Sequence, residues 1–160
     1  MTEEENIPIF NNWDDLNLKP ELLRGIYAYG FEKPSPIQSR AIHPIIQGYD
    51  LIAQAQSGTG KTGSFTIGAL SRIDITSNTN QVLILVPTHE LAHQITAVIT
   101  QLSDMMNGIR IKTLVGGSSI DEDVEDMRNN IPHVIVGCTG RVHDMIRRRH
   151  ININHFKLLK

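Results

Sequence analysis

Short apolar runs alternate along this chain with segments whose apolar residues recur at helical spacing. The runs show no alternation of polar and apolar positions, which is typical of strands that are buried on both faces of a sheet. The sequence therefore predicts strands at residues 50–55, 81–86, 109–115 and 133–136, with another strand beginning near Phe156.

Helical segments separate these strands, and proline and glycine mark the ends of the first two. Pro20 suits a first helical turn and Gly30 a C-terminal cap. Ser35 and Pro36 have the character of an N-cap and a first helical residue, and Gly48 would stop that helix. Further helices are expected at 61–73, 88–105, 121–129 and 141–149. This alternation predicts an α/β fold, with a parallel sheet and helices on both of its faces.

Composition and charge narrow the class of protein. A chain of 160 residues with 40% apolar residues has room for one ordinary globular domain. Its single cysteine, Cys138, excludes an internal disulfide and suits a reducing compartment. Residues 1–10 are polar and acidic, so we expect disorder there, and they lack the pattern of a secretory signal. The apolar run 82–86 is too short to span a bilayer, which favours a cytoplasmic protein without a membrane partner.

The strongest chemical signal is a phosphate-binding loop between the first predicted strand and the helix after it. Gly58 and Gly60 allow the backbone N–H groups to converge on phosphate oxygens, Lys61 adds a cation, and the Thr62 hydroxyl can ligate Mg²⁺. Ala55 stands where the common pattern has glycine, and a flexible turn is the alternative interpretation. We expect a nucleoside triphosphate on Ala55, Gln56, Ser57, Gly58, Thr59, Gly60, Lys61 and Thr62, with Lys61 and Thr62 as the catalytic residues.

Several motifs occur in an order that resembles the DEAD-box ATP-dependent RNA helicases. The segments that carry the resemblance are 30–38, 55–62, 87–92, 116–117 and 137–141, and it covers nearly the whole chain from Trp13. Residues 23–31 and 53–56 are most similar to the translation initiation factor subgroup. The resemblance implies that residues 11–160 form an incomplete N-terminal RecA-like P-loop domain that binds ATP and Mg²⁺, with RNA and translation initiation factors as partners.

The resemblance also implies an adenine pocket upstream of the phosphate loop. Gln38 would present its amide to the adenine edge, Phe31 would stack on the ring, and Trp13 would support the pocket. The alternative is structural, because Ser35 and Gln38 have the spacing of a capping box, and both aromatic residues could be core.

The RNA-contacting motifs depart from the family pattern. His89 replaces an arginine, and an imidazole cannot replace an always-charged guanidinium with its five donors. Cys138 and Thr139 stand where the family has Thr-Pro. We therefore expect weakened RNA contacts. The alternative is that these motifs have only structural roles, as one turn and the starts of two helices. The candidate RNA-binding residues are Pro87, Thr88, His89, Gly116, Gly117, Thr139, Gly140 and Arg141.

Other charged clusters are interpreted structurally. Residues 147–150, Arg-Arg-Arg-His, are expected to be a solvated helix end, with a nucleic-acid patch as the alternative. Residues 121–123 are expected to be an acidic helix N-terminus, and the histidines lack zinc-ligand spacing. A net charge of -2 gives no overall attraction to nucleic acid, so any RNA surface must be local.

The carboxylates that ATP hydrolysis requires are not evident in these 160 residues. In the family they belong to the Asp-Glu-Ala-Asp motif, just beyond the strand that begins near Phe156. We expect this chain alone to bind nucleotide weakly and not to hydrolyse it. A non-catalytic remnant that binds RNA or helicase partners is the alternative function, and an unrelated P-loop ATPase is a third.

Overall fold

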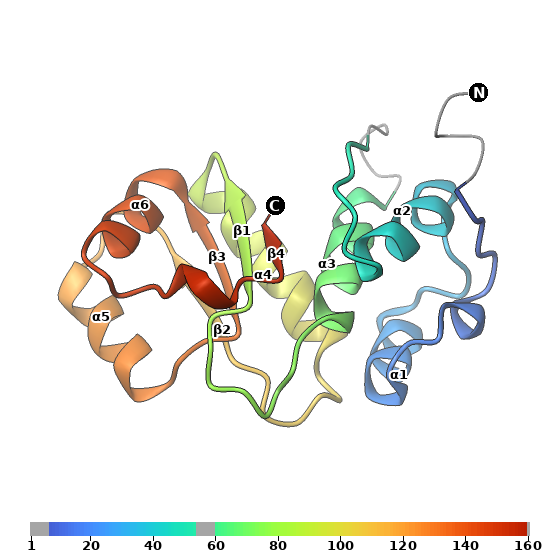
Figure 1. Cartoon of the computed structure of the whole chain (residues 1–160), viewed down its shortest axis with the longest axis horizontal. Helices are drawn as coiled ribbons and strands as arrows, with labels where there is room; N and C mark the ends of the chain where they lie inside the picture. Colours follow the sequence, from blue (N-terminus) through green and yellow to red (C-terminus); the bar gives the residue numbers. More distant parts are fainter. Residues whose placement is uncertain (1–6, 54–59, 160) are drawn as a thin grey trace. The chain divides into compact units, whose positions relative to one another are not determined.

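The chain forms two compact units, and the computed structural model describes residues 7–53 and 60–159 (Figure 1). The first unit comprises residues 1–72 and 101–106, and the second comprises residues 73–100 and 107–160. Each unit is built around its own set of predicted elements.

The first unit is helical, and its elements follow the predicted caps. A 3₁₀ turn at Trp13–Leu16 precedes α1 (Pro20–Tyr29), α2 (Pro36–Ile46) and α3 (Lys61–Ser71). Gly30 ends α1 in the left-handed region at φ 104°, where a glycine has no steric penalty. Ser35 and Gln38 form the capping box at the start of α2. All three predicted helices are confirmed.

Close helix contacts shape this unit. Trp13, Leu22, Ile26, Ile42, Ile67 and Leu70 form its fully buried centre. Where α2 crosses α3, a Cβ on Gly68 would lie 2.5 Å from Ile45 Cγ2. Gly25 allows α1 a similar approach to the backbone at Leu102, which belongs to this unit. Both crossings therefore depend on the absence of a side chain.

The strand predicted at 50–55 is wrong for its described part. Residues 50–53 have no regular structure, and Ile52 is 97% exposed, while residues 54 and 55 lie outside the described ranges. The described residues of the first unit contain no strand. An isolated strand has no partner for its backbone hydrogen bonds, so the apolar pattern alone does not produce one here.

The second unit contains a parallel four-stranded sheet in the order β2-β3-β1-β4 (Figure 1). The strands are β1 (Val82–Val86), β2 (Ile111–Leu114), β3 (Val134–Cys138) and β4 (Leu158–Leu159). Each lies at or close to its predicted position. Inside the unit, β3 extends two residues beyond the prediction because Gly137 and Cys138 pair with Leu85 and Val86 of β1.

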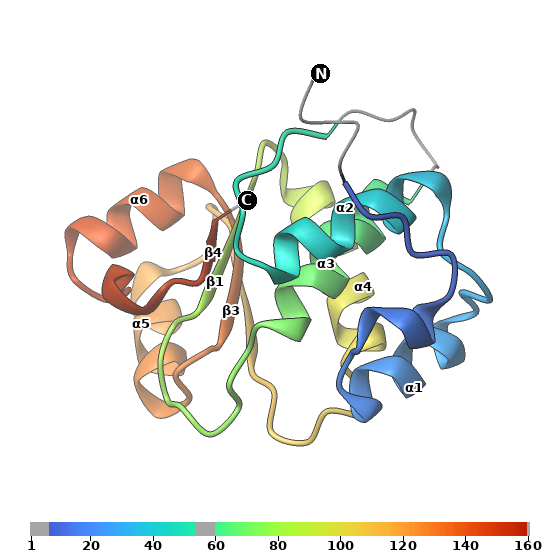
Figure 2. The same cartoon turned by 45° about the vertical axis from the view of Figure 1, so that its right-hand side comes forward.

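Helices cover both faces of this sheet, as predicted (Figures 1 and 2). They are α4 (His89–Leu102), α5 (Ile120–Asn129) and α6 (Thr139–Arg147). On one face, Met127 of α5 and Met145 of α6 pack with Leu83 and Ile135 in the core. On the other face, the hydroxyl of Thr96 on α4 lies 2.7 Å from that of Thr113 on β2. Among the described residues, no helix has both the length and the hydrophobicity to cross a membrane.

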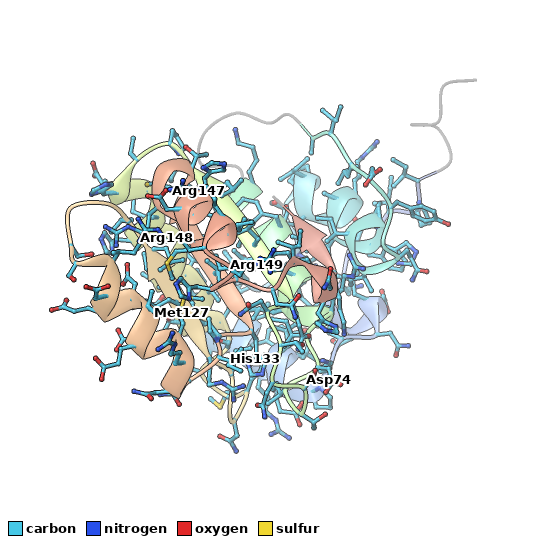
Figure 3. The ribbon with its side chains drawn as sticks, turned by 60° about the vertical axis from the view of Figure 1, so that its left-hand side comes forward. Asp74, Met127, His133, Arg147, Arg148 and Arg149 are labelled. Atoms are coloured by element: carbon cyan, nitrogen blue, oxygen red, sulfur yellow. The ribbon has the colours of Figure 1, made fainter. Side chains whose placement is uncertain are left out.

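His133 anchors the loop between α3 and β1 to the start of β3. Its ring is fully buried, its Nδ1 accepts the backbone N–H of Arg110 at 3.1 Å, and its Nε2 lies 3.2 Å from the Ile75 carbonyl (Figure 3). The neutral tautomer with the proton on Nε2 satisfies both contacts. Burial, aided by the Arg110 charge, lowers the pKa of His133 below its ordinary value of 6.5.

Candidate nucleotide and RNA sites

The N-terminus of α3 is the described part of the predicted phosphate loop. Gly60 caps the helix in the left-handed region at φ 95°. Lys61 is exposed and forms no ion pair with any residue in 7–53 or 60–159, and Thr62 follows it in the first turn. A free ammonium beside the positive end of a helix attracts an anion such as phosphate. Ala55, Gln56, Ser57, Gly58 and Thr59 lie outside the described residues.

Gln38 connects the capping box of α2 to this helix start. Its Oε1 accepts the Ser35 backbone N–H at 2.9 Å, and its Nε2 donates to the Gly60 carbonyl at 3.3 Å. The side chain is only 2% exposed. The capping role considered from the sequence is therefore present. Among the described residues, these contacts use one of the two amide N–H groups and one oxygen lone pair of Gln38.

The predicted aromatic residues lie together on the same side of the unit. The Trp13 Nε1 donates to the Phe31 carbonyl at 3.1 Å, and the two ring centroids are 6.2 Å apart. A Cβ on Gly63 would lie 2.6 Å from Gln38 Nε2 and 3.4 Å from Phe31 Cε2. Phe31 and Gln38 thus meet over the first turn of α3, while Trp13 is fully buried behind Phe31 as support.

The candidate RNA residues gather at one edge of the second unit. They follow the carboxyl ends of β1, β2 and β3, which the parallel register brings level: Val86 pairs with Cys138 and Leu114 with Gly137. A Cβ on Gly116 would lie 4.0 Å from His89 Nε2, so two of the three motifs are in contact distance. Ligands of parallel α/β sheets bind at this edge.

The individual residues at this edge differ in availability. Pro87, Thr88, His89, Gly117, Thr139 and Gly140 are exposed. The Thr88 hydroxyl accepts the Leu91 backbone N–H at 3.1 Å and so caps α4. Gly117 has φ 93°, as a tight turn requires, and Gly140 has open space around it. The helix starts and the turn that the sequence offered as alternatives are present, together with exposed N–H groups that could hold a phosphate.

The Arg141 side chain forms an ion pair and a hydrogen bond within the protein. Its guanidinium pairs with Asp123 at 2.6 Å and donates to the Ser118 carbonyl at 2.7 Å, and its side chain is 11% exposed. Asp123 also pairs with Lys112 at 3.1 Å, and Asp126 lies 2.9 Å from the same ammonium. Burial alone would lower the pKa of Lys112, but the contacts with Asp126 and Asp123 raise it above its ordinary value. In this structure Arg141 positions the loop after Gly117.

Sequence reasoning missed Asp123 and Lys112. The run at 121–123 does begin a helix, but Asp123 is buried on the face that also carries Met127, one turn further on. Lys112 stands two residues before the buried Leu114, so it points to the same face of the sheet. The sequence did contain a signal for this ion pair: Lys112 falls at a strand position that faces the core, and Asp123 falls at a helix position that faces the core.

Comparisons with known proteins agree with the motifs. The sequence pattern of a family described as DEAD/DEAH box helicase matches residues 35–159. The chain is 54% identical over 148 residues to "ATP-dependent RNA helicase eIF4A" of Chaetomium globosum, covering 92% of this chain and 37% of that protein. It is 54% identical over 155 residues to "ATP-dependent RNA helicase FAL1" of Meyerozyma guilliermondii, covering 97% and 38%. The chain thus spans little more than a third of these relatives.

Solved structures show the same likeness. A DEAD box protein from Methanococcus jannaschii superposes with a TM-score of 0.87 at 32% identity, over 94% of this chain and 41% of that one. Saccharomyces cerevisiae Dbp5 bound to RNA and ADP BeF3 gives a TM-score of 0.79 at 35% identity, over 94% and 37%. The fold is therefore that of these proteins over nearly all of the chain.

Proposed function

Because this chain belongs to the DEAD/DEAH box helicase family, as its motifs predicted, we propose that it forms the ATP-binding and RNA-contacting part of an ATP-dependent RNA helicase. The observation that carries the proposal is the start of α3. There the exposed Lys61, which forms no ion pair with the described residues, stands beside a glycine cap, under the pair formed by Phe31 and Gln38.

We assign ATP to the first unit. The backbone amides of the phosphate loop and Lys61 hold the phosphates. Thr62 ligates the Mg²⁺ that neutralises them, which fits the position of its hydroxyl in the first turn of α3. Phe31 stacks on adenine. Its own ring lies close to the first turn of α3, because Gly63 has no side chain there. Gln38 uses its remaining N–H and lone pair to recognise the base, while its other contacts fix the amide in place.

Replacing Lys61 by alanine should weaken ATP binding by tenfold or more, since it removes a full charge from the phosphates, an effect of at least about 1.4 kcal/mol. The measurement is a calorimetric titration of the whole chain with Mg-ATP. Arg24→Ala, which removes an exposed charge on α1, should leave the affinity within twofold. Equal affinities in the parent and in Lys61→Ala would refute the phosphate site.

We assign the RNA backbone to the edge formed by Thr88, Gly116, Gly117, Thr139 and Gly140, whose N–H and hydroxyl groups can bind phosphate. His89 is the weak point of this surface. It lies beside Gly116 but brings no fixed charge, while Arg141 is held by Asp123.

His89→Arg should strengthen binding of a single-stranded oligonucleotide RNA by roughly three- to tenfold, because it adds one phosphate contact. The slope of log affinity against log salt should steepen by about 0.7. Fluorescence anisotropy across a salt series measures both, with His93→Arg, one turn further along α4, as the matched control. If His93→Arg gave the same gain, the cause would be the added positive charge in general and not a contact at this edge.

The relatives named eIF4A support a role in translation initiation, and with it the cytoplasm as the place of action and initiation factors as partners. The match to FAL1 is equally high in identity. The proposal of a translation role therefore rests on the names of relatives, and the ATP and RNA sites are independent of it.

A further inference from the structure

A groove runs between α5 and the turn that follows α6, away from the edge assigned to RNA. We call it the α5–α6 groove, and it is lined by Val124, Met127, Arg128, Ile131, Arg148 and Arg149. This hollow has a volume of about 460 Å³, and it shares Val124, Arg128 and Arg148 with a larger adjoining hollow of about 550 Å³. Figure 3 shows Met127, Arg148 and Arg149 in this region. The two hollows together form one surface along α5.

The walls of the groove carry positive charge that the protein does not neutralise. Arg128, Arg148 and Arg149 form no ion pair within residues 7–53 and 60–159. Arg147, by contrast, pairs with Asp144 at 3.1 Å. His150 lines both hollows, and Asp121 and Glu125 line only the larger one. A strip of unpaired guanidinium groups attracts carboxylates or phosphates.

The backbone of the turn places these arginines. Arg149 has φ 62°, a left-handed conformation in which glycine is the ordinary residue and other residues are disfavoured. The Arg149 N–H donates to the Ile146 carbonyl and the His150 N–H to the Met145 carbonyl, so the turn is closed on α6. The arginine is thus held against the groove by a fixed backbone.

The base of the groove is aliphatic. Met127 is buried in the sheet core and Val124 packs against it, while Ile131 is 39% exposed. No Phe, Tyr or Trp lines either hollow, so the groove lacks the large aromatic rings on which single-stranded nucleic acid usually stacks. A peptide is the better fit, since its carboxylates can meet the arginines while an aliphatic side chain covers Val124 and Ile131.

We propose that the α5–α6 groove is a docking site for a short segment of a partner protein that carries acidic and aliphatic residues. The site does not depend on the ATP or RNA sites.

The test is a selection of 12-residue peptides from a random display library on the immobilised chain, without nucleotide or RNA. Enriched peptides should contain Asp or Glu together with Leu, Ile or Val. In fluorescence anisotropy, Arg148→Glu and, separately, Arg128→Glu should each weaken these peptides at least tenfold. Arg147→Glu, the neighbouring arginine outside the groove, should change their affinity less than twofold. Circular dichroism confirms that each variant is folded.

Three results would overturn the proposal. They are a selection that enriches no peptide or only peptides without carboxylates, equal affinities in Arg148→Glu and Arg147→Glu, and a loss of affinity for single-stranded RNA in Arg148→Glu as large as the loss for peptides. The last result would identify the groove as a nucleic-acid surface instead.

Discussion

Asp123→Ala should destabilise the second unit by about 3–5 kcal/mol, the usual cost of leaving buried charges without their partner. Asp123 faces both Lys112 and Arg141, whose side chains are only 20% and 11% exposed. Removing its carboxylate leaves Arg141 without its ion pair and Lys112 with Asp126 alone, and both cations have limited access to water. Arg141 also loses the contact that orients it towards the Ser118 carbonyl, so the loop after Gly117 should loosen at the same time.

Urea unfolding followed by far-ultraviolet circular dichroism measures this loss. The matched control is Asp126→Ala, which removes a second carboxylate from the same lysine. Asp126 is 67% exposed, so water and salt already screen its contact, and the control should cost less than about 1 kcal/mol. If both variants lost the same stability, burial of the Asp123 pair would not be the cause.

Gly25→Ala should destabilise the first unit by about 3 kcal/mol, although the same change inside an ordinary helix stabilises it by about 1 kcal/mol. The new Cβ would overlap the backbone carbonyl of Leu102. A backbone atom cannot rotate away as a side chain can, so α1 or the segment 101–106 would have to move. The only tryptophan of the chain, Trp13, is buried in this unit, and its fluorescence in a urea titration reports the change.

Gly140→Ala is the control for this substitution. Gly140 also lies in a helix, but no atom lies within 4 Å of a Cβ built on it. This variant should be neutral or slightly more stable, so the two glycine changes should have opposite signs. A comparable loss in both would mean that the α1 crossing is not what requires glycine at position 25.

Local signals predicted the elements of the fold well. Pro20, Gly30 and Ser35 start or end helices through their own backbone and side chains, so their effect can be predicted from the sequence alone. The buried runs at β1 and β3 became strands because each had a parallel neighbour. The run at 50–53 had the same apolar pattern but no partner strand in its unit, and pairing is a property that no single segment carries.

The sequence identified many residues of the candidate sites, but it did not predict which contacts their side chains make. The motif containing Gln38 was recognisable, yet its bond to Gly60 joins residues 22 positions apart and depends on how α2 meets α3. Arg141 was assigned to RNA from its motif, and its ion pair with Asp123 follows from the packing of α5 beside α6. The arginines at 148 and 149 were expected to be a solvated helix end, and only the three-dimensional course of the chain sets them along a groove.

The anchor at His133 makes unfolding of the second unit a proton-linked reaction. Burial and the Arg110 charge lower the pKa of the native ring, and a second proton would also displace the Arg110 N–H from Nδ1, whereas the unfolded ring takes up a proton near pH 6.5. Unfolding below that pH therefore absorbs protons. The stabilising contribution of His133 is complete above pH 6.5 and is lost as the pH falls towards the lowered native pKa, so mild acid weakens this unit.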